Sequence, residues 1–576
     1  MIRSQKAVAR LIRRCLPEGA NLSENDVFQL LERPQREDHG DIAFPCFQLA
    51  KSLKKAPPAI AQDLAGRVQG GLAEAGIESA VHTGPYLNFR VSPATALGIL
   101  AEVNEKGTDF GKSQEGAGRK ILLEYSSPNV AKELHIGHFR TTMLGQSIRN
   151  LYQAAGWNTV AVNHLGDWGS QFGKVAWAYL RWGSEKELEE SAVSYLVKLY
   201  VRFHEESEKN PDLDREARLL FKKIEEGDPE LTKLWKRFCD LSVRDLEKTY
   251  RRLGVKFDHY LGESFYFDKI DRVVDLLRKK NLLVESEGAQ IVKLDDFGMP
   301  PCLVLTGDGT TLYATRDIAA ALWRKEHFGF ERCLYVVGSE QTLHFRQVFK
   351  VLELLGMGWA GELEHVSYGL YRFKDGKFST RRGRVILLTD VVDEARDKAL
   401  EVINAKNPNL PRKEETAEMI GLGAVVFNDL STDRVKDVEF DWDRILDFEG
   451  DTGPYLQYTH ARACSILRQA RAKGLAPRLP SAGAALLSQP SAVSLMKQLG
   501  RLEPSILGAV RLNKPSIVAG YAIDLAQSFN SFYRQVKVLE EGADPEEVKG
   551  RLGLVDGFRV VLANTLALLC MKAPEE

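Results

Sequence analysis

Two histidines spaced three residues apart stand where a phosphate-binding helix would begin. His135 and His138 follow an expected strand at 121–125 and a loop, and they precede an expected helix at 139–155. The free N–H groups and the positive dipole at a helix N-terminus favour an anion, and Gly137 lets a nucleotide pack on the backbone because it has no Cβ. The spacing alone also fits two exposed histidines or two metal ligands, but the basic and polar loop before it favours phosphate.

A second basic segment lies far downstream. Residues 374–383 carry Lys377, Ser379 and Arg381, with a glycine on either side. Such a loop can close over a triphosphate and neutralise the charge that develops during transfer, although a basic turn alone is usually solvated surface. Two phosphate-directed segments are what a nucleotidyl transfer needs, since one holds the nucleotide and the other the leaving pyrophosphate.

The elements that must position these side chains alternate between strands and helices. Strands are expected at 121–125, 158–163, 332–338 and 363–370. Their alternation with helical stretches predicts an α/β fold with a parallel sheet and helices on its faces. Long amphipathic helices at 191–255 form an insertion, and beyond about residue 447 only helices are expected.

Length and composition limit the class of protein. At roughly 150 residues per domain, 576 residues predict about four domains. The net charge of −1 excludes a globally basic surface, so any polyanion site must be local. The apolar stretch at 560–571 is too short to cross a bilayer, so we expect no membrane span. The basic N-terminal residues fit a first helix or an organelle transit peptide, and we favour the helix.

The cysteines give a further indication of compartment. The seven cysteines are scattered and include no Cys-x-x-Cys, which argues against structural zinc and disulfides. We therefore expect a reducing, cytoplasmic location and no metal held by the protein itself.

With these motifs in place, the sequence resembles the class I aminoacyl-tRNA synthetases, whose signatures are called HIGH and KMSKS, and within them the arginyl-tRNA synthetases. The likeness is carried by residues 126–138, 163–173, 313–317 and 451–462. It implies a Rossmann-type parallel-sheet catalytic domain with a helical insertion, a small α+β N-terminal domain and an all-α anticodon-binding domain. It also implies an arginine–tRNA ligase that uses ATP and Mg²⁺, acts on L-arginine and tRNA(Arg), and works as a monomer.

The resemblance also implies boundaries for these domains. We expect an N-terminal domain that contacts the tRNA elbow at 1–110 and a catalytic domain at 119–385, with its helical insertion at about 180–300. A connecting segment at 386–446 and the anticodon-binding domain at 447–576 complete the chain.

An arginine pocket is implied by residues that match the family. These residues are Glu124, Asn129, Tyr313, Asp317 and Gln341. A guanidinium offers five donors in a planar fork, which carboxylates satisfy with charge-assisted bonds. Without the resemblance, Asp317 could pair with Arg316 or cap a helix, and Gln341 could cap a turn.

For ATP, the resemblance implies binding and catalytic residues in both signatures. The ATP-binding set is His135, Gly137, His138, Gly338, His344, Lys377, Ser379 and Arg381, and the catalytic set is Lys132, His135, His138 and Lys377. The arginine carboxylate would attack the α-phosphorus, and the adenosine 2′-hydroxyl of tRNA would then take the arginyl group. Thr380 replaces the second lysine of KMSKS, so Lys132 or Arg381 is expected to supply the missing charge.

Contacts with tRNA are implied at both ends of the chain. Tyr86 and Asn88 match residues that hold an unpaired base of the tRNA elbow, while Tyr458, His460 and Arg462 match the anticodon-binding domain. The alternative is that these residues belong to an ordinary strand and to a helical core.

Two other functions fit parts of the sequence. An adenylate-forming ligase for small molecules could share the His-x-Gly-His pattern, but it needs neither the C-terminal helices nor the segment 313–317. A synthetase relative that binds tRNA without charging it would not need a complete arginine pocket.

Overall fold

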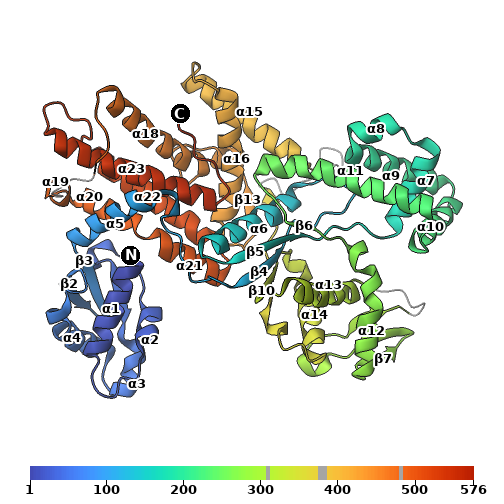
Figure 1. Cartoon of the computed structure of the whole chain (residues 1–576), viewed down its shortest axis with the longest axis horizontal. Coiled ribbons are helices and arrows are strands. Elements are labelled where there is room, and N and C mark those ends of the chain that lie inside the picture. The colour runs from blue at the N-terminus through green and yellow to red at the C-terminus, as the bar shows by residue number, and fades with distance from the viewer. Residues whose placement is uncertain (35, 307–311, 374–385, 479–483) are drawn as a thin grey trace.

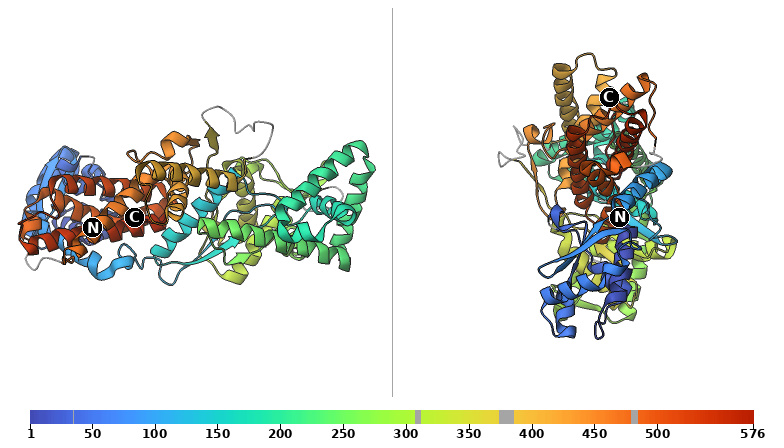
Figure 2. Two further views of the ribbon diagram at one scale, coloured as in Figure 1. Left: turned by 90° about the horizontal axis from the view of Figure 1, so that it is seen from above. Right: turned by 90° about the vertical axis from the view of Figure 1, so that its left-hand side faces the viewer.

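The computed structural model describes residues 1–576 except 35, 307–311, 374–385 and 479–483. The N-terminal domain and the C-terminal helices lie together at one end of an elongated molecule, and the helical insertion lies at the other end (Figure 1). The view from above in Figure 2 shows the same arrangement, with the catalytic sheet between the two ends. None of the helices in the described part of the chain is long and apolar enough to span a bilayer.

A five-stranded sheet forms the centre of the catalytic domain. Its strands are β4 (Lys120–Glu124), β5 (Asn158–Asn163), β6 (His259–Tyr260), β10 (Arg332–Tyr335) and β11 (Leu363–His365). They are all parallel, in the order β11-β10-β4-β5-β6. The order reverses between β4 and β10, and such a switch point opens a crevice at the carboxyl ends of the strands, where α/β proteins bind ligands.

Helices cover both faces of this sheet, as its apolar strands require. Ile121 and Leu123 pack in one core with α6 (Ile136–Ala154). Leu122 packs in a second core with α12 (Ile270–Lys279), α13 (Tyr313–Phe328) and α14 (Thr342–Leu354). The α/β fold predicted from the alternation is therefore confirmed. The expected strand at 363–370 is shorter, however, because β11 ends at His365.

The insertion is helical in its first part only. Its helices are α7 (Ser170–Trp182), α8 (Glu185–Glu190), α9 (Ala192–Lys209), α10 (Asp212–Glu225) and α11 (Pro229–Leu253). An antiparallel sheet is formed by β7 (Leu283–Ser286), β8 (Ala289–Val292) and β9 (Cys302–Leu305). Its first two strands lie within the range expected to be helical, and β9 lies just beyond it. Glu287 and Gly288 both have positive φ between β7 and β8, which makes the two-residue turn of a hairpin.

The N-terminal domain has the small α+β architecture implied by the resemblance. Its elements are α1 (Ile2–Cys15), α2 (Glu24–Leu30), β1 (Ile42–Pro45), α3 (Leu49–Leu53), α4 (Pro57–Arg67), β2 (Ile77–Thr83), β3 (Tyr86–Val91) and α5 (Pro93–Lys106). The sheet is antiparallel, with β3 in the centre. The basic first residues form α1, whose Val8, Ala9 and Ile12 are buried in the domain core.

Helices dominate the remainder of the chain. They are α15 (Leu388–Lys406), α16 (Lys413–Ser431), α17 (Trp442–Ile445), α18 (Gly453–Ala472), α19 (Ala484–Leu487), α20 (Pro490–Leu499), α21 (Leu502–Leu512), α22 (Ser516–Gln535) and α23 (Pro545–Leu568). A short parallel pair, β12 (Tyr371–Phe373) and β13 (Val438–Phe440), precedes the helical bundle. Within the bundle, α20 and α21 meet near Gly500.

Candidate active site at the carboxyl edge of the sheet

The first signature caps its own helix. His135 is the N-cap of α6, and its Nδ1 accepts from the N–H of Gly137 at 3.1 Å. The Nδ1 of His138 accepts in return from the N–H of His135 at 3.1 Å. Because both Nδ1 atoms accept, each neutral ring carries its proton on Nε2. The two Nε2–H groups therefore remain available as donors to a ligand oxygen.

Burial keeps these two imidazoles uncharged. It lowers the pKa of His138 to about 3, with further contributions from His135 and Lys132, and it lowers the pKa of His135 as well. The influence of Lys132 on both rings also means that its exposed ammonium lies close to them. The expected cradle thus combines two neutral donors, helix N–H groups and one exposed cation.

The loop between β4 and α6 is held in an unusual backbone conformation. Ser126, Ser127 and Ala131 have φ of 73°, 46° and 58°, the left-handed region in which side chains other than glycine are strained. Asn129, on the same loop, packs so closely on Gly166 that a Cβ at Gly166 would lie 2.0 Å from the amide oxygen of Asn129. The glycine of the 163–173 motif therefore makes room for Asn129.

Glu124 at the end of β4 is already paired within the protein. Arg324 of α13 donates from Nη1 to its Oε2, and the same guanidinium donates from Nε to the hydroxyl of Tyr266 at 3.0 Å. The Nη2 of Arg324 lies 3.2 Å from Nδ1 of His164. Glu124 and Arg324 are 6% and 1% exposed, so this ion pair is buried. Much of the charge of Glu124 is thereby balanced before any substrate arrives.

Asp317, on the same helix, is more accessible. Its Oδ2 lies 2.5 Å from Nε2 of His344, and its side chain is 26% exposed. Arg316 instead pairs with Glu263 at 2.7 Å, so Asp317 does not pair with Arg316. Burial raises the pKa of Glu263, although the paired guanidinium of Arg316 acts in the opposite direction.

The acidic edge carries an excess of negative charge. Among the described ion pairs, Glu124 pairs with Arg324 and Glu263 pairs with Arg316, whereas Asp317 pairs with no arginine or lysine. If all are ionised, one negative charge remains unmatched. The guanidinium of a bound arginine would balance this charge, and the accessible Asp317 is the carboxylate best placed to bind it.

The other residues expected around arginine and ATP surround this edge. Tyr313 is 69% exposed, one helical turn before Asp317. Gln341 is the N-cap residue of α14, yet its side chain makes no cap bond, so it is not occupied as a cap. Gly338 follows β10 and bridges to Tyr368. A Cβ on Gly338 would lie 2.9 Å from the carboxylate of Glu340.

The second signature lies outside the described residues, so Lys377, Ser379 and Arg381 are not placed. Its two flanks are described. β12 ends at Phe373, and after the segment Leu387 bridges to His135. The flank that follows the second signature therefore lies beside the first signature.

The residues expected to contact tRNA differ in accessibility. Tyr86 lies edge-to-face with the ring of Phe47, which is 51% exposed, and the buried amide nitrogen of Asn88 has no hydrogen-bond partner. Tyr458 is 50% exposed, and the guanidinium of Arg462 lies 4.8 Å from its ring centroid. Tyr458 and Arg462 line a hollow of about 1010 Å³ between α15, α16, α18 and α22.

His460 requires a correction. It is 2% exposed, and its Nδ1 bonds to the carbonyl of Pro574 at 2.8 Å. Its ring faces the core of the bundle because it lies on the inner side of α18, where it secures the C-terminal residues. A surface contact of His460 with RNA does not fit this placement.

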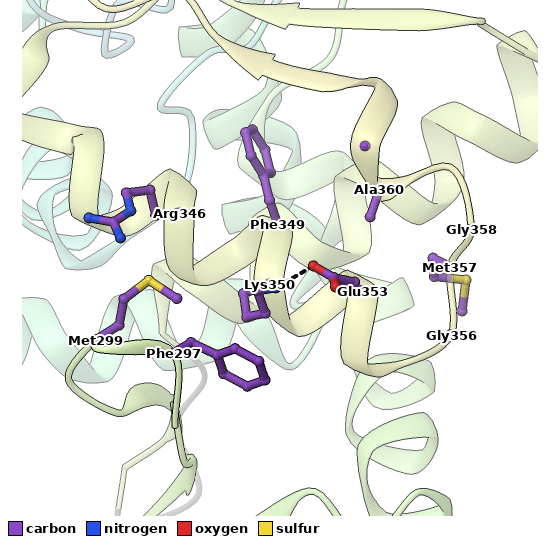
Figure 3. A pocket seen from close by; sticks show the side chains of 11 residues that line it. Phe297, Met299, Arg346, Phe349, Lys350, Glu353, Gly356, Met357, Gly358 and Ala360 are labelled. Atoms are coloured by element: carbon purple, nitrogen blue, oxygen red, sulfur yellow. Dashed lines mark hydrogen bonds and ion pairs between the residues drawn. The ribbon is translucent and has the colours of Figure 1, made fainter. Parts of the chain in front are cut away.

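Another hollow, of about 770 Å³, is separate from this chemistry. It lies between the turn before β9 and α14, and Phe297, Met299, Arg346 and Phe349 are among its lining residues (Figure 3). Lys350 pairs there with Glu353 at 2.5 Å. None of the residues expected to bind arginine, ATP or tRNA lines this hollow.

Sequence reasoning missed Arg324, His164, Tyr266 and Glu263. Arg324 follows Asp317 by seven residues, which places both on one face of α13. An arginine in the apolar run of that helix was the one local signal, but its partner Glu124 lies 200 positions away. No group of three or more His, Cys, Asp or Glu in the described ranges could hold a metal ion.

Comparison with known protein families covers most of the chain. Three family models match: tRNA synthetases class I (R), catalytic domain, at 100–442; DALR anticodon binding domain, at 456–576; and arginyl tRNA synthetase N terminal domain, at 4–91. The fold and the site at the switch point thus define a class I aminoacyl-tRNA synthetase.

Relatives identify the group within that class. The arginine–tRNA ligase of Alkaliphilus metalliredigens is 46% identical over 96% of this chain and 97% of its own length. That of Clostridium perfringens is 44% identical over 98% and 99%. The arginyl-tRNA synthetase of Thermus thermophilus has a TM-score of 0.80 at 28% identity and 99% coverage of both chains. The chain belongs to the arginyl-tRNA synthetase family.

Proposed function

We propose that the chain joins L-arginine to tRNA(Arg) in two steps, first forming arginyl-adenylate from ATP and then transferring the arginyl group to the terminal adenosine 2′-hydroxyl. The observation that carries this proposal is the unmatched carboxylate charge beside a phosphate cradle at the switch point. A guanidinium and a nucleotide can occupy these two neighbouring places at once, which brings a carboxylate to the α-phosphorus.

For arginine, Asp317 binds the guanidinium with charge-assisted bonds, and Tyr313 packs against it from the open side. Glu124 acts mainly through Arg324, with which it forms a buried ion pair. Asn129 and Gln341 are assigned to the polar groups of the amino acid. This division explains why Asp317 is accessible while Glu124 is buried.

For ATP, the Nε2–H groups of His135 and His138 donate to phosphoryl oxygens, and Gly137 allows the nucleotide to pack on the backbone. Gly338 and His344 lie on the ribose and adenine side. Catalysis needs no protein nucleophile, since positioning and charge stabilisation suffice for phosphoryl chemistry.

Lys132 replaces the missing lysine of the second signature. Its ammonium influences the pKa of both histidines, so it lies close to where phosphates would bind. Lys377, Ser379 and Arg381 remain assigned to the pyrophosphate from the sequence alone. Mg²⁺ would be held mainly by the phosphates, because the described side chains form no metal cluster.

For tRNA, the chain uses surfaces at both domains that flank the catalytic sheet. Tyr86 holds a base of the elbow, whereas Asn88 is only 4% exposed and, like His460, does not reach a ligand at the surface. Tyr458 and Arg462 form part of a hollow that suits anticodon bases, since exposed aromatic and guanidinium planes stack on them. We further propose that the chain acts as a cytoplasmic monomer.

The test uses radiolabelled arginine, ATP and total tRNA, together with pyrophosphate exchange in the presence and absence of tRNA. Arginine attached to tRNA supports the proposal. Exchange that depends on a different acid would favour a small-molecule adenylate-forming ligase. Retained tRNA binding without charging would favour a non-charging relative, and sedimentation of the pure chain tests the monomer.

A further inference from the structure

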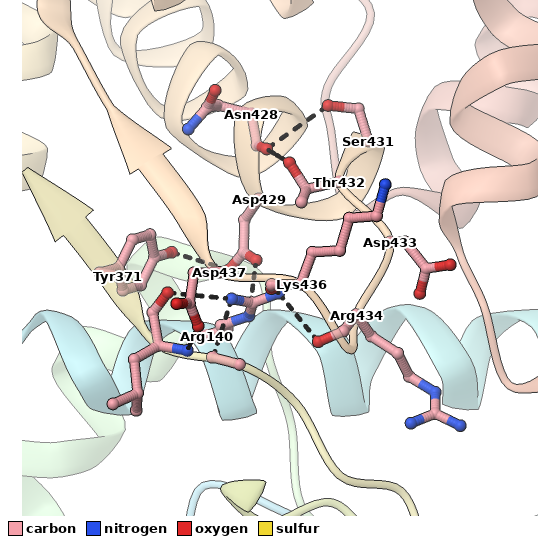
Figure 4. A network of polar contacts seen from close by, with 12 residues as sticks. Arg140, Tyr371, Asn428, Asp429, Ser431, Thr432, Asp433, Arg434, Lys436 and Asp437 are labelled. Atoms are coloured by element: carbon pink, nitrogen blue, oxygen red, sulfur yellow. Dashed lines mark hydrogen bonds and ion pairs between the residues drawn. The ribbon is translucent and has the colours of Figure 1, made fainter.

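A buried guanidinium joins the helix of the first signature to the strand that leads into the second. Arg140 lies on α6, two residues after His138, and it is 1% exposed. Its Nη1 donates to the carbonyl of Gly369 at 2.8 Å, and its Nη2 donates to the carbonyls of Arg434 and Lys436 at 3.1 and 3.0 Å (Figure 4). One side chain of α6 thereby holds two other chain segments.

A carboxylate from the C-terminal half completes this cluster. Asp429 of α16 places Oδ1 3.3 Å from Nε of Arg140, and its Oδ2 accepts from the hydroxyl of Tyr371 at 2.7 Å. The side chains of Arg140 and Asp429 are 2% and 3% exposed. Burying such a pair is costly, and a hydrophobic pair could fill the space. The N–H donors of Arg140, however, bind the carbonyls of Gly369, Arg434 and Lys436, so the side chain also fixes the positions of these backbone segments.

Both flanks of the second signature are bonded to α6 or to the residues directly before it. β12 starts beside the carbonyls that Arg140 binds, and it ends at Phe373, directly before residues 374–385. After that segment, the N–H of Leu388 donates to the carbonyl of Leu134 at 2.8 Å. The exit flank is therefore held by bonds between backbone groups. The entry flank pairs with β13, and the side chain of Arg140 joins that pair to α6.

We propose that Arg140 is a positioning residue of the adenylation step, which fixes the entry of the second signature relative to His135 and His138. This inference rests on the proposed function. Misplacing a group that acts in the transition state by about 1 Å can reduce the rate on the order of a hundredfold. A lysine could still pair with Asp429, but its single ammonium cannot span the carbonyls that a planar fork reaches.

The test compares Arg140→Lys with Arg149→Lys. Arg149 is also a buried arginine of α6, but it donates to the carbonyl of Lys256 at 2.5 Å and to Asp258 at 2.7 Å, beside β6 and away from β12. Both substitutions keep the positive charge but replace the planar guanidinium by a single ammonium. The full-length proteins are measured by arginine-dependent pyrophosphate exchange over a range of ATP and arginine concentrations, and by thermal unfolding.

We expect Arg140→Lys to lower kcat at least about tenfold while both KM values stay within about threefold, because the lost interaction acts in the transition state. Arg149→Lys should keep kcat within about twofold of the unaltered chain. Equal losses in both variants would overturn the inference, because they would report a general loosening of α6. A kcat for Arg140→Lys within twofold of the unaltered chain would do the same.

Two further results have defined meanings. If Arg140→Lys does not fold, Tyr371→Phe replaces it, since it keeps the aromatic ring and removes the hydroxyl that donates to Asp429. A kcat lowered at least about threefold at unchanged KM then supports the inference, and an unchanged kcat overturns it. Absence of exchange by the unaltered chain would overturn the proposed function and this inference together, whereas an active chain with an unaffected Arg140→Lys overturns this inference alone.

Discussion

Replacing Asp317 by asparagine tests the charge balance of the arginine pocket. The substitution keeps the size of the side chain and its contact with His344, but it removes the charge that we assign to the substrate guanidinium. Because Glu124 and Glu263 each face an internal arginine, neither can fully replace it. The acidic edge of Asp317→Asn would then be neutral before arginine binds.

The size of the effect follows from the exposure of Asp317. A hydrogen bond to a charged group contributes about 1.5 to 3 kcal/mol. Since the side chain is 26% exposed, solvent screens part of the interaction and the lower half of that range applies. A loss of about 1.5 to 2 kcal/mol corresponds to a KM for arginine raised roughly 10- to 30-fold, while the KM for ATP should change little.

The assay is arginine-dependent pyrophosphate exchange at saturating ATP. Asp268→Asn serves as the matched control, because this carboxylate is 78% exposed and contacts only a neighbouring lysine among the recorded ion pairs. A KM for arginine that stays within twofold in Asp317→Asn would refute the charge argument. Equal increases in both variants would show that the change is not specific to the pocket.

Three other predictions use different readouts. Glu124→Gln leaves Arg324 buried without a charged partner, so urea denaturation should show a loss of about 3 to 5 kcal/mol; an unchanged midpoint contradicts the buried pair. Because the pKa of His138 falls from 6.5 to about 3 on folding, the unfolded chain takes up this proton first as the pH falls, and stability is lost between those two values. His138→Asn should make that loss smaller in acid titrations, and an identical pH profile would count against a buried neutral ring. Lys132→Ala should slow adenylate formation at least roughly tenfold, about 1.4 kcal/mol of barrier, and an unchanged pre-steady-state rate would remove Lys132 from the mechanism.

Local patterns in the sequence predicted the fold class and the first signature. Alternating apolar segments indicated the parallel sheet, and His135 and His138 at the head of a helix indicated free N–H groups that favour a phosphate. Such features depend on residues within a few positions of one another, so their physics can be judged without the fold. The hairpin at Glu287 and Gly288 was missed because its strands are short and lie between helices.

The tertiary structure decided which of the predicted polar residues are accessible to a ligand and which are paired within the protein. The sequence places Glu124 and Asp317 in the same pocket by resemblance, but only the fold brings Arg324 to Glu124 from 200 positions away and leaves Asp317 accessible. It likewise turns His460 inward and directs Arg140 to the entry of the second signature. The burial and the partners of a charged side chain depend on contacts between segments that are far apart in the sequence, and these contacts cannot be predicted from the residues around that side chain.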